Sequence, residues 1–139
     1  MKYAIIYWSR YGNGKKIVNR LEKKLPGETK LFKTDEADPK AMPEADFYVF
    51  SAPAEAFRVQ RNMRSFMKGI KGMEGRKYGI INTHGMDRNW LGSMEKVLTK
   101  KKMKMVAGLD FKVGKEANTG NALPDGWEAE VDEFANKLK

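Results

Sequence analysis

The sequence of 139 residues contains no cysteine and a single histidine. Without cysteine there can be no disulfide, thiolate nucleophile, iron–sulfur cluster or cysteine zinc site, and one histidine does not make a metal centre. We therefore expect no metal site. Any redox chemistry in this chain must come from a bound cofactor.

Long apolar runs are also missing. No stretch approaches the roughly 18 consecutive apolar residues of a membrane-spanning helix, and a strand pattern begins at the N-terminus where a signal peptide would have an apolar core. We expect a soluble, cytoplasmic protein with no membrane partner. The length suits one domain over residues 1–139.

Acidic residues are too few to balance the basic ones. The chain has 18 Asp and Glu against 27 Lys and Arg, a formal charge of +9. This charge suits an anionic partner such as a nucleotide cofactor, an acidic protein, nucleic acid or a membrane surface, but a solvated basic face is the commonest cause. Nucleic acid is disfavoured because no basic groove with interleaved aromatic residues is evident.

Hydrophobic periodicity predicts alternating strands and helices. Nearly continuous apolar runs indicate buried central strands over residues 3–8, 47–50 and 78–81, whereas edge strands are expected over 30–34 and 105–113. Apolar stripes at helical spacing cover residues 17–25, 59–70, 90–98 and 127–138. The polar, proline-containing segment 35–43 is expected to be a loop or a single turn.

This alternation predicts an α/β fold, a three-layer doubly wound sheet of five parallel strands. With the second and fifth strands at the edges, the strand order is 2-1-3-4-5, and the topological switch point lies between strands one and three. A ligand is expected at the carboxyl ends of these strands. The loops there are residues 9–15, 51–58 and 83–90.

The turn Ser9-Arg10-Tyr11-Gly12-Asn13-Gly14-Lys15 is the most informative segment. It joins an apolar strand to a helix, and its small residues let several backbone N–H groups converge on one anion. The turn resembles the phosphate loop of the flavodoxin family. Residues 46–53 (Asp-Phe-Tyr-Val-Phe-Ser-Ala-Pro) and 78–85 (Tyr-Gly-Ile-Ile-Asn-Thr-His-Gly) resemble that family's third and fourth strands with their flavin loops, and the uninterrupted fifth strand matches its short-chain form.

The resemblance implies noncovalent binding of FMN. Transferred to this chain, the hydroxyls of Ser9 and Tyr11 and the amides of the first turn hold the phosphate. Phe57 and Trp90 are the candidates for stacking on the flavin, with Met86 as a softer alternative. The implied cofactor-binding residues are Ser9, Arg10, Tyr11, Gly12, Asn13, Gly14, Lys15, Ser51, Ala52, Pro53, Ala54, Phe57, Thr83, His84, Gly85, Met86 and Trp90. His84 either donates a hydrogen bond to the flavin edge or contributes only its backbone.

Two departures from the family pattern concern the site. Gly14 stands where the family commonly has a threonine, so that the charge of Lys15 or Arg10 could replace the missing hydroxyl. The family is usually acidic, whereas this chain is basic, and we expect Lys15, Arg58 and Arg88 near the mouth of the site. Cations there would favour the anionic reduced flavin.

The resemblance implies an electron carrier that shuttles electrons between redox proteins with acidic docking surfaces, without converting a substrate and so without catalytic residues. Two alternatives stay open. One is a small FMN-dependent oxidoreductase of the same fold, such as a quinone reductase or a relative of menaquinone-dependent protoporphyrinogen oxidase. The other is a binding module of this fold that has lost the cofactor.

Overall fold

The computed structural model describes residues 1–55, 58–113 and 119–139. The strands are β1 (Lys2–Tyr7), β2 (Glu28–Lys33), β3 (Phe47–Glu55), β4 (Arg58–Val59), β5 (Lys77–His84) and β6 (Lys104–Lys112). The helices are α1 (Asn13–Lys24), α2 (Arg61–Gly69), α3 (Leu91–Lys100) and α4 (Trp127–Lys137).

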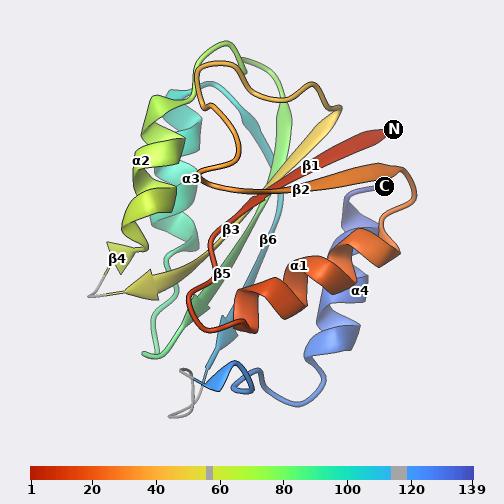
Figure 1. Ribbon diagram of the computed structural model, residues 1–139, viewed down its shortest axis with the longest axis vertical. Coiled ribbons are helices and arrows are strands. Elements are labelled where there is room, and N and C mark those ends of the chain that lie inside the picture. Colours follow the sequence, from red (N-terminus) through yellow and green to blue (C-terminus); the bar gives the residue numbers. More distant parts are fainter. Residues whose placement is uncertain (56–57, 114–118) are drawn as a thin grey trace.

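Five strands form one parallel sheet in the order β2-β1-β3-β5-β6 (Figure 1). This order confirms the predicted fold class, and β2 and β6 are the edge strands as expected. The central strands are buried because helices cover both faces, which is why they read as continuous apolar runs.

The sheet differs from the prediction around its third strand. The predicted strand ends at Phe50 and a loop follows over residues 51–58. In the structure β3 continues to Glu55, and β4 is a sixth strand that pairs antiparallel with it. Serine and proline favour loops, but Ser51, Ala52 and Pro53 remain paired with β5. The ladder continues because β5 also extends beyond its apolar run, to His84.

Two helices cover each face of the sheet (Figure 1). Helices α1 and α4 pack with Ile5, Val49 and Ile81 on one face, and helices α2 and α3 pack with Ile6, Phe50 and Ile80 on the other. The connection between β2 and β3 is a loop with one isolated bridge, as predicted for this polar segment. Within the described residues, none of the helices is both long and apolar enough to span a membrane.

Helix α4 lies close to the sheet because β5 has a glycine beneath it. A Cβ atom at Gly79 would lie 2.8 Å from Phe134 Cζ and 3.4 Å from the Ala107 carbonyl oxygen. We expect Gly79→Ala to lower the free energy of unfolding by about 1–3 kcal/mol through overpacking, measured by urea denaturation.

Gly92→Ala is the matched control. Gly92 lies in α3, and a Cβ atom there would meet nothing within 4 Å. Alanine favours a helix, so this variant should be as stable as the parent or more stable, by up to about 1 kcal/mol. Equal destabilisation by both substitutions would contradict the packing account of Gly79.

Candidate functional site

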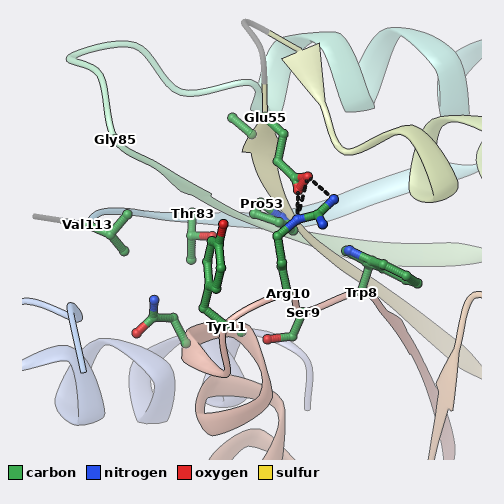
Figure 2. Close-up of a pocket in the computed structure, with 12 residues that line it drawn as sticks. Trp8, Ser9, Arg10, Tyr11, Pro53, Glu55, Thr83, Gly85 and Val113 are labelled. Atoms are coloured by element: carbon green, nitrogen blue, oxygen red, sulfur yellow. Dashed lines mark hydrogen bonds and ion pairs between the residues drawn. The ribbon is translucent and has the colours of Figure 1, made fainter. Parts of the chain in front are cut away.

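A cleft opens where β1, β3 and β5 reach their carboxyl ends, at the switch point of the sheet (Figure 2). The space within it is about 620 Å³ including the open mouth, and its walls are mainly apolar. We call it the carboxyl-end cleft. The described residues that line it are Trp8, Ser9, Arg10, Tyr11, Asn13, Gly14, Pro53, Ala54, Glu55, Thr83, Gly85 and Val113.

The turn before α1 forms one wall of the cleft. Gly12 adopts φ 101°, a conformation that favours glycine, and the Ser9 hydroxyl oxygen accepts the N–H groups of Gly12 at 3.1 Å and Lys15 at 3.2 Å. Within the described part of the chain, the N–H groups of Arg10, Tyr11 and Gly14 have no acceptor. The first turn of α1 contains no acidic residue. Free N–H groups at a helix N-terminus make an anion site.

An ion pair joins this turn to the end of β3. Arg10 donates from Nη2 to Glu55 Oε1 at 2.7 Å and from Nε to Oε2 at 2.9 Å, as Figure 2 shows. This bidentate contact raises the pKa of the Arg10 guanidinium. The side chains are 49% and 28% exposed, so the pair is partly screened by solvent. No other Lys, Arg, Asp or Glu lies among the described lining residues, whose formal charge is therefore balanced.

The loop after β5 is held by buried hydrogen bonds. Asn82 is fully buried; it donates from Nδ2 to the Ala52 carbonyl at 3.1 Å and accepts the Trp90 N–H at 3.0 Å. The ring of His84 is also buried, with Nδ1 2.6 Å from the Met86 carbonyl oxygen and Nε2 2.8 Å from Asp110 Oδ2. These contacts fix the loop relative to β3 and β6.

Nine of the predicted cofactor residues line the cleft: Ser9, Arg10, Tyr11, Asn13, Gly14, Pro53, Ala54, Thr83 and Gly85. Gly12 shapes the turn beside them. The others lie elsewhere. Ser51 and Ala52 are buried in β3, the His84 ring bonds within the protein, and the Met86 side chain is exposed. Trp90 lines a different groove, and Phe57 lies outside the described residues.

The cations expected at the mouth of the site do not line the cleft. The Lys15 ammonium donates to the Tyr7 hydroxyl at 2.8 Å and lies over its ring. Arg58 lines the same groove as Trp90, and the guanidinium of Arg88 lies 4.4 Å from the centre of the Trp90 ring. Each of these three side chains is directed to another partner or another surface, and an effect of their charge on a bound flavin stays a prediction.

Three lining residues were missed by the sequence analysis. Trp8 directly follows β1, and its place before the predicted phosphate turn was a usable signal. Glu55 was missed because β3 was ended too early. Val113 had no local signal, since it reaches the cleft through the pairing of β6 with β5.

The segment that follows the second undescribed gap also supports the turn. The Ala122 N–H donates to Asn13 Oδ1 at 3.0 Å, and a Cβ atom at Gly120, where φ is 75°, would lie 2.4 Å from the Tyr11 carbonyl oxygen. The turn is thus held from both sides. Within the described residues, no group of three His, Asp or Glu side chains could hold a metal ion.

Comparisons of the sequence and of the structure with known proteins point to the same family. A family model described as flavodoxin domain matches residues 4–111. No curated protein matches the sequence. Similar solved structures include a flavodoxin of Streptococcus pneumonia TIGR4, at 15% identity and a TM-score of 0.81, and oxidised flavodoxin 1 of Bacillus cereus, at 13% and 0.80. Each alignment covers 99% of this chain and 97% of the other.

A larger protein contains the same fold. Rubredoxin oxygen:oxidoreductase from Desulfovibrio gigas matches at 16% identity with a TM-score of 0.77, over 99% of this chain and 35% of that chain. At these identities the likeness of the solved structures shows a shared fold.

The two hydrogen bonds of Asn82 generate a prediction for the loop after β5. Asn82→Ala removes the side-chain hydrogen bond to the Ala52 carbonyl and leaves the partly buried Trp90 N–H without its acceptor, and should lower the free energy of unfolding by about 2–3 kcal/mol. Asn89→Ala is the matched control, because Asn89 accepts the neighbouring Leu91 N–H at an exposed site. It should cost at most about 1 kcal/mol. Urea denaturation measures the free energy of unfolding of both variants. Equal decreases would contradict the prediction that the buried site makes the larger contribution.

Proposed function

The chain belongs to the flavodoxin family, and on that premise we propose that it binds FMN in the carboxyl-end cleft and carries electrons between redox proteins. The observation that supports FMN best is the turn before α1. Its free N–H groups meet the positive end of a helix at one side of an apolar cleft. When bound, the flavin supplies the electron-carrying chemistry, which this cysteine-free chain cannot supply itself.

In this proposal backbone groups hold the phosphate. The N–H groups of Arg10, Tyr11 and Gly14 are available to it, and the Ser9 hydroxyl, which already accepts two N–H groups, keeps its own proton for donation. The charges of Lys15 and Arg10 are engaged by Tyr7 and Glu55. The missing hydroxyl at Gly14 is therefore offset by converging amides and the helix dipole.

Apolar and aromatic side chains form the part of the cleft that suits the flavin ring. Tyr11 and Thr83 line this part of the cleft, and Trp8, Pro53, Ala54 and Val113 complete its walls (Figure 2). Tyr11 and Trp8 replace Trp90 as the described aromatic candidates for contact with the ring, because Trp90 does not line the cleft. These walls would exclude water from one side of the ring.

The cleft supports a carrier better than an enzyme. Apart from Glu55, which Arg10 holds, the described lining residues include no carboxylate or imidazole to exchange protons with a substrate. The proposal includes redox partners with acidic docking surfaces, in keeping with the charge of +9. Rapid reduction of a quinone by the FMN-loaded protein without any protein partner would instead establish the enzyme alternative.

Binding of FMN and of riboflavin tests the phosphate site. Flavin fluorescence is quenched on binding in this fold if the ring enters the cleft, so titration gives both affinities. FMN should bind at least about tenfold more tightly than riboflavin, because hydrogen bonds to a charged group contribute more than neutral ones. Ser9→Ala should weaken FMN at least about tenfold and riboflavin much less.

The control for this substitution is Ser65→Ala, an exposed serine on α2. It should leave both affinities unchanged. Equal affinities for FMN and riboflavin would refute the phosphate site, and failure to bind either would support a module without cofactor.

The ion pair between Arg10 and Glu55 gives a second prediction for FMN. Glu55→Gln removes a negative charge from the cleft and frees the guanidinium, so FMN should bind roughly twofold to tenfold more tightly; Arg10→Gln should have the opposite effect. The double variant restores the balanced charge and should return close to the parent affinity. Isothermal titration calorimetry measures the FMN affinity of all four proteins. If the pair only shapes the cleft, both single variants and the double variant should bind FMN more weakly than the parent.

A further inference from the structure

The net positive charge of the molecule comes from one part of the chain. Residues 58–104 contain thirteen Lys or Arg and three Asp or Glu, whereas the remainder contains fourteen and fifteen. This segment therefore carries a net charge of +10, and the remainder of the chain carries −1. The segment contains β4, α2, β5 and α3, and its two helices together cover one face of the sheet (Figure 1).

These cations lack carboxylate partners in the part of the chain that the structure describes, where none of the thirteen forms an ion pair. The opposite face differs, because Arg20 of α1 donates two hydrogen bonds of 2.8 Å to Asp132 of α4 and lowers the pKa of that carboxyl group. Unpaired like charges repel one another, so an acidic partner would relieve a cost that the free protein bears.

The face of the sheet that α2 and α3 cover contains a groove between these two helices. The groove has a volume of about 490 Å³ including its open side, and its walls are almost entirely apolar. Three of the residues that line it, which we call its floor, are the apolar or aromatic Val59, Trp90 and Val97. Arg58, Arg64 and Lys68 also line it, and their side chains have long aliphatic stems. We call it the α2–α3 groove. Apolar surface bordered by arginine and tryptophan is typical of protein interfaces.

Two arginines beside this groove are held in place. Arg64 donates from Nε to the Val59 carbonyl at 2.8 Å, and the Arg88 guanidinium lies 4.4 Å from the centre of the Trp90 ring. Ordered side chains lose less conformational entropy when a partner binds. The Arg88 guanidinium occupies one face of the Trp90 ring, where a nucleic acid base would have to displace it, and this favours a protein partner.

The groove and the carboxyl-end cleft share one β-hairpin. In that hairpin Val59 pairs with Ala54 and Arg58 pairs with Glu55. Ala54 and Glu55 line the cleft, whereas Val59 and Arg58 line the groove. Paired strands lie about 5 Å apart, so a protein seated in the groove is adjacent to the cleft.

We propose that the α2–α3 groove is the docking site for a redox partner, which inserts apolar side chains from a segment rich in Asp and Glu. The redox character of the partner rests on the proposed function; the binding of such a segment does not. The carboxylates of the segment pair with the cations at the edge of the groove, and its apolar side chains cover the floor between α2 and α3.

The test uses the full chain and a fluorescein-labelled peptide in which Glu alternates with Leu. Fluorescence anisotropy should show saturable binding that weakens as salt is raised. Arg64→Glu with Lys68→Glu should weaken binding by about tenfold or more. The matched control is Lys23→Glu with Lys137→Glu, which changes the net charge equally on α1 and α4 and should cost less than about threefold.

Two further variants separate docking from general attraction. Val97→Asn keeps the charge but makes the floor polar, and should weaken the peptide roughly fivefold. Lys68→Glu alone changes an exposed side chain with no ion pair among the described residues, so it keeps the test valid if the double variant does not fold. Lys68→Glu alone should weaken peptide binding about threefold. Circular dichroism confirms the fold of each protein.

Three results would overturn the docking site: equal losses in the two double variants, no effect of Val97→Asn, or tighter binding of oligothymidylate than of the peptide. FMN titration of the same proteins separates the two proposals. If FMN binds and the peptide does not, the docking site is wrong and the function stands. If the peptide binds as expected and FMN does not, the function is wrong and the acidic binding surface stands.

Discussion

The pairing of β3 with β5 is the constraint on which both surfaces of this protein depend. The ladder runs from Phe47 opposite Lys77 to Pro53 opposite Thr83, two or three residues beyond the apolar run of either strand. Asn82 reinforces its end by joining the Ala52 carbonyl to the start of α3. A shorter ladder would leave Ala54 and Glu55 in a loose loop, and neither the wall of the cleft nor the hairpin that borders the groove would have a fixed position.

The sequence predicted the fold because burial on both faces leaves a direct mark on composition. Continuous apolar runs indicated the three central strands, and charged or alternating patterns indicated the two edges, which was enough to fix the order. The ends of β3 were not predictable in this way. Ser51 and Pro53 favour loops, but both pair with residues of β5 about 30 residues later in the chain, and Ser51 also pairs with Tyr7 of β1.

The site was predictable where it is contiguous in sequence. The turn from Ser9 to Gly14 was found because one local conformation brings its N–H groups together. Glu55 and Val113 reach the cleft through strand pairing, and no local pattern marks them. The ring contacts of Lys15 and Arg88 were not predictable for another reason: long cationic side chains reach many partners, and the tyrosine and tryptophan rings that they contact cannot be inferred from spacing.

The net charge of the chain acts on the approach of a partner, whereas the charge inside the cleft acts on a ligand that is bound there. In salt of physiological strength, exposed charges are screened over about 8 Å, so the unpaired cations of α2 and α3 act mainly on a partner that approaches their own face. Inside the cleft the balanced pair of Arg10 and Glu55 is the local source of charge. If the cleft binds FMN as proposed, the net charge of the chain therefore need not hold the flavin or set its potential. The same hairpin separates the two effects: Glu55 faces the cleft with its counterion, while Arg58, its partner across the hairpin, faces the groove without one among the described residues.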